Sequence, residues 1–111
     1  MTQITYDYFA KVDIRTGRIV RVEDFPGARK PAYKLWIDFG ELGIKTSSAQ
    51  ITERYDIEAL LDSMVIAVTK FTPRQVADFL SEVLVLGTVL GADEVVLIRP
   101  DCDVSPGKRV L

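Results

Sequence analysis

The chain has 111 residues, of which 48% are hydrophobic and 27% are charged, and its formal net charge is −2. These values predict a single globular domain over residues 1–111, with enough apolar residues for one core. The sequence contains no histidine, and its one cysteine, Cys102, lies between two aspartates that disfavour a thiolate. Histidine-based catalysis is therefore excluded, and we expect a binding protein rather than an enzyme, with no catalytic residue, metal or cofactor.

The chain lacks the features that direct a protein into or across a membrane. Its apolar runs are shorter than the roughly 20 residues that span a bilayer. Its first residues have neither the basic nor the apolar region that is typical of a signal peptide. A lone cysteine also suits a reducing compartment. We therefore expect a cytoplasmic protein without membrane insertion.

The N-terminal part of the chain predicts one helical turn followed by a long strand. The helical turn covers residues 5–10, and the strand covers residues 12–23. In this strand Asp13 falls on the polar face and Ile19 is out of phase with the other apolar residues. Gly17, near the middle, predicts a bend or a bulge there, as small closed barrels require of their first strand.

The middle of the chain predicts three more strands and a short helix. Residues 33–39 alternate cleanly between apolar and polar, which places Trp36 on the polar face of the second strand. Residues 44–51 form a more polar strand, and residues 56–61 form a short helix with an aspartate cap. Residues 64–68 are apolar on both faces, which indicates a buried strand.

The last part of the chain predicts a helical turn and two buried strands. Residues 72–78 begin with Thr-Pro, which is typical of a helix start. Residues 83–86 and 95–98 are apolar on both faces. Short strands, Gly and Pro turns and only brief helices predict an all-β protein, and about five long strands in this length fit an OB-fold barrel.

The chain has more apolar residues than a five-stranded barrel of this size can bury. The surplus lies in the last two apolar runs and in the N-terminal aromatic residues. An exposed apolar surface is usually an interface, and a symmetric homodimer is the simplest way to cover it. We therefore expect N- and C-terminal extensions that form a homodimer, with the interface residues Tyr8, Phe9, Val95 and Val96.

Three segments resemble a known family over nearly the whole chain. They are KVDIRTG at residues 11–17, IKTSSAQI at residues 44–51 and SEVLVLG at residues 81–87. The segments are similar to those of the tRNA-binding OB-domain superfamily, which is found appended to some aminoacyl-tRNA synthetases and in free-standing dimers. Within it, the second and third segments resemble the CsaA group of export-related chaperones.

The resemblance implies an OB fold, a homodimer and one of two kinds of partner. These are unfolded or precursor polypeptides for the CsaA group, and tRNA for the wider superfamily. In the tRNA-binding relatives the last motif usually has the form Ser-x-Gly-Met, whereas this chain has Ser81 followed by Glu82, Val83 and Leu84. The departure makes the expected groove less basic and more apolar.

Eight residues are candidates for a peptide- or RNA-binding groove. Trp36 is either a platform for a base or an apolar peptide side chain, or it packs under a loop or across the dimer. Phe71, beside a turn, is a pocket candidate, whereas Phe79 is expected in the core. Basic residues and hydroxyls in an OB groove would contact a phosphate backbone, although a single surface cation is more often only solvated. The candidates are Arg15, Trp36, Lys45, Ser47, Lys70, Phe71, Arg74 and Ser81.

Two functions stay open at this point. The first is a chaperone that holds unfolded polypeptides without ATP, because the chain has no phosphate-binding GxxxxGK loop. The second is a dimer that recognises the shape of tRNA through a cluster of Arg15, Lys45, Lys70 and Arg74, with strongly salt-dependent affinity. The acidic net charge favours the first.

Overall fold

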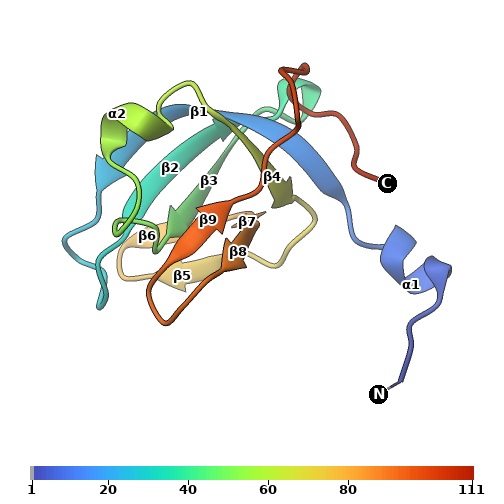
Figure 1. Ribbon diagram of the computed structural model, residues 1–111, viewed down its shortest axis with the longest axis horizontal. Coiled ribbons are helices and arrows are strands. Elements are labelled where there is room, and N and C mark those ends of the chain that lie inside the picture. Colours follow the sequence, from blue (N-terminus) through green and yellow to red (C-terminus); the bar gives the residue numbers. More distant parts are fainter. Residues whose placement is uncertain (1) are drawn as a thin grey trace.

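The protein is a nearly closed barrel of antiparallel strands with short helices at its ends (Figure 1). The computed structural model describes residues 2–111. The five barrel strands pair in the order β3-β2-β1-β4-β7. Their bounds are Ile14–Asp24 for β1, Tyr33–Asp38 for β2, Ile44–Ala49 for β3, Met64–Val68 for β4 and Leu84–Val85 for β7. This order is that of an OB fold, so the predicted fold class is confirmed.

The remaining elements decorate the barrel. Two short hairpins are formed by β5 with β6 and by β8 with β9. The bounds are Tyr6–Ala10 for α1, Gly40–Leu42 for the 3-10 helix η1, Ile57–Leu60 for α2, Arg74–Val76 for β5, Phe79–Ser81 for β6, Gly87–Val89 for β8 and Val95–Leu97 for β9. Two of the three predicted helical segments, those at residues 5–10 and 56–61, are confirmed, and the Asp56 side chain accepts a hydrogen bond from the amide of Ala59 at 2.8 Å.

The barrel closes where β3 meets the segment between β6 and β7. The amides of Glu82 and Val83 both donate to the carbonyl of Thr46, at 2.8 and 3.2 Å. The Glu82 carboxylate accepts in return from the amide of Thr46 at 3.0 Å and from its hydroxyl at 2.9 Å. Beyond Thr46, toward the end of β3, the amide of Ser48 donates to the side-chain hydroxyl of Ser81 at 3.0 Å.

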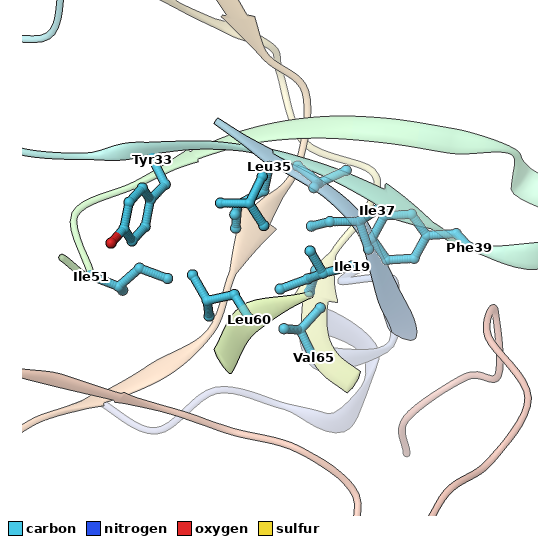
Figure 2. Close-up of a cluster of buried hydrophobic side chains, with 11 residues drawn as sticks. Ile19, Tyr33, Leu35, Ile37, Phe39, Ile51, Leu60 and Val65 are labelled. Carbon is cyan, nitrogen blue, oxygen red and sulfur yellow. The ribbon is translucent and has the colours of Figure 1, made fainter. Parts of the chain in front are cut away.

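The core fills the inside of the barrel with alternate residues of each strand. Along β2 the side chains of Tyr33, Leu35 and Ile37 are buried while those between them are half-buried, so the predicted alternation is confirmed. Figure 2 shows Ile37 beside Phe39 and Ile19. All five residues of β4 are buried, as predicted.

The first strand differs from the prediction in where it is irregular. The pairing of β1 with β2 shifts register between Ile19 and Arg21, so the bulge lies at Val20 and not at Gly17. The extra residue explains why Ile19 is out of phase in the sequence yet fully buried. Gly17 instead leaves room for close packing, because a Cβ there would lie 2.6 Å from Cγ2 of Ile37 and 2.7 Å from Cε1 of Phe39.

Residues 72–78 do not form the predicted helical turn. They contain β5, which pairs with β6 across a two-residue turn at Ala77 and Asp78. Ala77 has a φ of 52°, and the Gln75 side chain donates to its carbonyl at 2.9 Å. Strand pairing satisfies more backbone groups than an isolated helical turn of this length, which is why it prevails over the Thr-Pro signal.

The last two apolar runs are less buried than their composition predicts. Val83 is buried, but Leu84 in β7 is 44% exposed, and the residues of β9 are half-buried. The reason is that the β8–β9 hairpin covers the barrel with one face only. Val95 and Leu97 pack against the core, whereas Val89 at the end of β8 is 74% exposed.

The C-terminal segment lies along β1 beyond the end of β2. The amide of Thr16 donates to the carbonyl of Lys108 at 2.9 Å, and the amide of Val110 donates to that of Ile14 at 2.8 Å. Arg15 and Arg109 form an antiparallel bridge. The C-terminal segment therefore pairs with the part of β1 that β2 does not reach, and it extends the sheet.

Asp13 lies at the start of this arrangement and is buried, contrary to its predicted place on a polar face. Its carboxylate accepts from Nε of Arg15 at 2.9 Å and from the hydroxyl of Thr69 at 3.0 Å. Burial alone would raise the pKa of Asp13, but the Arg15 and Thr69 hydrogen bonds and the charges of Arg15 and Lys70 outweigh it and lower that pKa below its ordinary value. The ionised carboxylate thus joins the ends of β1 and β4.

Candidate binding groove

The candidate site is a groove around the end of β3 that consists of three adjoining hollows. Gln50, just after β3, lines all three. The walls come from the loop between β1 and β2, the β5–β6 hairpin and the β8–β9 hairpin. The two hairpins and β3 lie close together in Figure 1, although they are far apart in the sequence.

The apolar hollow has a volume of about 280 Å³. It lies between the end of β3, strand β7 and strand β9, where the barrel edge is open. Most of its lining is apolar, and Phe71 and Leu84 are 43% and 44% exposed there. The lining residues are Ser48, Ala49, Gln50, Ile51, Phe71, Arg74, Ser81, Val83, Leu84, Val85, Val95 and Leu97.

The basic hollow has a volume of about 570 Å³ and lies on the outer side of β3. Its charged residues are Arg29 and Lys30 from the loop after β1, and Arg74 from β5. Ser48, Gln50 and Arg74 line both this hollow and the apolar one. The lining residues are Ala28, Arg29, Lys30, Ala32, Ser48, Gln50, Arg74 and Val76.

The mixed hollow has a volume of about 380 Å³ and continues the groove toward the tip of the β8–β9 hairpin. It carries one cation, Lys30, and two carboxylates, those of Glu53 and Asp93. Lys30 also lines the basic hollow, and Val95 also lines the apolar hollow. The lining residues are Lys30, Pro31, Gln50, Thr52, Glu53, Ala92, Asp93 and Val95.

Two tyrosines hold the β8–β9 hairpin at the groove. The hydroxyl of Tyr33 donates to the carbonyl of Tyr55 at 2.8 Å, and the hydroxyl of Tyr55 accepts from the amide of Leu97 at 3.0 Å. Burial and the negative charges of Asp24 and Asp56 raise the pKa of Tyr33 above its ordinary value. Tyr33 therefore stays neutral and keeps its donor at physiological pH.

Three of the eight predicted groove residues meet in the apolar hollow. They are Phe71, Arg74 and Ser81. The hydroxyl of Ser81 accepts from the amide of Ser48 at 3.0 Å, which fixes β6 against β3. Arg74 is exposed, and its partner in the hairpin is Ser81.

Trp36 packs under the β5–β6 hairpin, which is one of the alternatives that the sequence leaves open. Its ring lies 5.7 Å from that of Phe79 in an edge-on arrangement, and the Arg21 guanidinium lies 4.5 Å from its centroid. Phe79 also contacts Phe25, with centroids 5.6 Å apart. The sequence predicts Phe79 as a core residue. In the structure it is instead part of an aromatic cluster outside the barrel.

The other predicted groove residues lie elsewhere. Ser47 is 1% exposed and points into the barrel, so its prediction as a groove residue is wrong. Arg15 is engaged by Asp13 and by the carbonyl of Gly107 at 3.1 Å. Lys45, half-buried on β3, and Lys70, exposed after β4, line none of the three hollows. Of the four residues predicted as a basic cluster for tRNA, only Arg74 lines the groove, and the role of the cluster stays a prediction.

Sequence reasoning missed most of the groove lining, including the polar residues Arg29, Lys30, Ser48 and Gln50. The first two lie in a turn that Lys30-Pro31 marks in the sequence, but nothing there indicates where the turn packs. Ser48 could have been predicted from the alternation of residues 44–51, if Ser47 had been assigned to the inner face of the strand. Its neighbour on the outer side of the strand then belongs to the groove.

The predicted dimer residues lie in two places. Tyr8 is 61% exposed on α1, which projects away from the barrel in Figure 1, and Phe9 beside it is half-buried. Val95 and Val96 are half-buried on β9, where Val95 packs against the core. Their role in a dimer stays a prediction.

Within residues 2–111, no group of three or more Asp, Glu or Cys side chains is placed to hold a metal ion. The same residues contain no helix that is long and apolar enough to cross a membrane.

Comparison with known proteins gives two kinds of relative. Residues 14–109 match the family described as "Putative tRNA binding domain". Methionine--tRNA ligases are similar to most of the chain, with 34% identity over 104 residues for that of Methanococcoides burtonii and 38% over 108 residues for ligase 1 of Sorangium cellulosum. The chain spans only 15% of the length of each ligase.

Two solved structures match over their whole length. The chaperone CsaA of Bacillus anthracis is 45% identical, with a TM-score of 0.95, and the match covers 99% of this chain and 100% of that one. The CsaA chaperone protein of Picrophilus torridus is 51% identical, with a TM-score of 0.92, and the match covers 98% and 100%. With the OB barrel and the family match, these similarities show that the chain belongs to the tRNA-binding domain family and, within it, to the CsaA group.

Proposed function

We propose that the protein is a chaperone that binds unfolded or precursor polypeptides in the groove at the end of β3 and assists protein export. The observation that carries the proposal is the apolar hollow. It presents Phe71, Leu84 and Val85 at an open edge of the barrel, where an apolar side chain of another polypeptide loses contact with water. The similarity to two CsaA chaperones supports the same function.

The size of the hollow suits side chains better than a complete small ligand. Pockets for drug-sized ligands have volumes of roughly 300–1,000 Å³, and the apolar hollow has about 280 Å³. It therefore accepts one or two apolar side chains of an extended chain. Such a site holds many different polypeptides weakly, as a chaperone requires.

The proposed mechanism is binding and release by mass action. A protein that binds the unfolded chain lowers its free concentration and so slows its aggregation, without a nucleotide. We further propose that the protein acts as a homodimer in the cytoplasm, with exposed aromatic residues of α1 such as Tyr8 in the interface. A dimer would present two grooves to one client, which raises the apparent affinity.

The test is suppression of aggregation by matched variants. Phe71→Ser removes an exposed apolar residue that lines the hollow, and Leu80→Ser removes one of similar exposure, 46%, that lines none of the three hollows. We expect the wild type and Leu80→Ser to slow the light scattering of a denatured client at equimolar dimer, and Phe71→Ser to be several-fold less effective. Equal activity of all three proteins would contradict the proposal, as would failure of the wild type.

A second candidate function is tRNA binding, which the family match and the basic hollow favour. Arg29, Lys30 and Arg74 would contact phosphates. This function predicts that the affinity for bulk tRNA falls steeply with salt, and that Arg74→Glu weakens it. A filter-binding titration at two salt concentrations tests it, and a flat salt dependence would exclude it.

A further inference from the structure

We propose that the groove selects polypeptide segments in which an apolar residue is adjacent to an acidic one. The apolar side chain enters the apolar hollow, and the carboxylate enters the basic hollow. This inference rests on the proposed polypeptide binding and adds to it a sequence preference. It follows from the position of the two hollows and from their charges.

The two hollows meet at one ridge, with the apolar hollow toward β7 and β9 and the basic hollow toward the loop between β1 and β2. The ridge is the end of β3, where Ser48 and Gln50 line both hollows, and Arg74 faces both from β5. In an extended polypeptide successive side chains point to opposite sides. A segment that lies along the ridge therefore directs one side chain into each hollow, and the two side chains belong to neighbouring residues.

The basic hollow lacks the negative charge that would balance its cations. Among residues 2–111, none of Arg29, Lys30 and Arg74 forms an ion pair, whereas five other arginines do. The described lining of this hollow contains no carboxylate. An aspartate or glutamate of the bound chain supplies the missing charge, and an arginine fork binds a carboxylate through two parallel hydrogen bonds.

The distribution of charge along the groove favours a single carboxylate over a nucleic-acid backbone. The mixed hollow, which continues from the basic hollow through Lys30 and Gln50, carries Glu53 and Asp93. A phosphate backbone that ran along the groove would meet these two carboxylates and be repelled. An acidic side chain ends within the basic hollow and does not reach them.

The experiment compares three fluorescent peptides that differ at one position. Each contains one leucine in a polar, uncharged sequence, followed by Glu, Gln or Lys. Fluorescence anisotropy with the wild type should give an affinity for the Glu peptide about fivefold higher than for the Gln peptide, and weaker binding still of the Lys peptide. The difference should shrink at high salt.

Charge-reversal variants test whether the cations of the basic hollow cause the preference for an acidic residue. In Arg74→Glu the Lys peptide should bind better than the Glu peptide. Lys108→Glu changes the net charge equally but lies on the C-terminal tail, outside the three hollows, and it should keep the wild-type order. Arg29→Glu is a second variant in the basic hollow, which replaces Arg74→Glu if that variant does not fold. It should also weaken the preference for the Glu peptide.

Each contrary result has a separate meaning. Equal, measurable affinity for the three peptides would overturn the preference and leave polypeptide binding intact. Absence of binding to any peptide would overturn both. An unchanged order in both basic-hollow variants would exclude this hollow as the acidic subsite. If those variants also lost affinity for tRNA, the hollow would be assigned to RNA instead.

Discussion

At the scale of single residues, Asp13 is a buried carboxylate that joins the start of β1 to the residue after β4. It is 4% exposed and is held by Arg15 and Thr69. Asp13→Asn removes the charge of a buried, hydrogen-bonded carboxylate and weakens its contacts with Arg15 and Thr69. We expect a loss of about 2 kcal/mol in the free energy of unfolding, measured by urea titration.

The matched control is Asp62→Asn, because the side chain of Asp62 is 88% exposed and its nearest ion-pair distance, to Arg18, is 3.6 Å. This variant should change the stability by less than about 0.5 kcal/mol. A similar loss in both variants would mean that net charge, and not the buried network, is responsible.

The Asp13 network also predicts a pH dependence. The pKa of Asp13 is lowered in the folded protein, so folding favours the ionised form. Its contribution is complete above the unfolded pKa of about 4, and it is lost as the pH falls through the lower folded pKa. The stability difference between wild type and Asp13→Asn should therefore be constant from pH 7 to pH 5 and shrink below pH 4. A difference that grew on acidification would contradict this sign.

Gly17 is the residue where the core has no space for one more carbon. Gly17→Ala would bring a Cβ within 2.7 Å of both Ile37 and Phe39, which are packed in the core. We expect a loss of about 1–3 kcal/mol by thermal or urea unfolding. Gly91→Ala is the control, because a Cβ there meets nothing within 4 Å, and it should be nearly neutral. Equal effects at both positions would contradict crowding as the cause of the loss.

At the scale of elements, the closure of the barrel depends on Glu82. Its side chain accepts two hydrogen bonds from Thr46, and Glu82→Ala removes both. We expect a loss of about 1 kcal/mol and, in hydrogen exchange, an opening of β3 that exposes the Thr46 and Ser48 amides about fivefold more often. Glu41→Ala, at an exposed residue of η1, should leave these amides unchanged. Unchanged exchange in Glu82→Ala would mean that the backbone bonds alone close the barrel.

How well each element could be predicted from the sequence depended on whether local signals and pairing agree. Residues 33–39 alternate, and all but the last of them pair with β1 on one side and β3 on the other, so sequence and structure agree there. Residues 72–78 carry a helix-start signal, but β6 offers a pairing partner that only the fold reveals. The position of the bulge at Val20 could likewise not be predicted, because Gly17 is the stronger local signal for an irregularity in the strand.

At the scale of the whole molecule, the exposed aromatic residues of α1 predict self-association. Tyr6 and Tyr8 are 72% and 61% exposed. Tyr8→Arg should therefore shift the protein toward the monomer in light scattering coupled to size-exclusion chromatography. Leu42→Arg, at a 41% exposed apolar residue on η1, is the control and should keep the wild-type mass. A monomeric wild type, or equal dissociation of both variants, would contradict the proposed role of α1.

The candidate groove was less predictable than the fold. The OB barrel follows from three segments with a family resemblance, which the comparisons confirm. The groove is assembled from four segments that the sequence does not bring together, so Phe71, Arg74 and Ser81 were found while Arg29 and Lys30 were not. Ser47 and Ser48 illustrate the limit, because a shift of one residue exchanges the inner and outer faces of a strand.

In the proposed function, burial of an apolar side chain in the apolar hollow provides most of the affinity for a polypeptide, and the basic hollow adds the preference for an acidic neighbour. The most direct measurement is competition between the fluorescent leucine–glutamine peptide and bulk tRNA for the wild type, at low and at moderate salt. The peptide should stay bound in both salts and in the presence of tRNA, because burial of an apolar side chain is not screened by ions. Displacement of the peptide by tRNA, together with loss of its binding at moderate salt, would contradict the claim and identify one shared basic site.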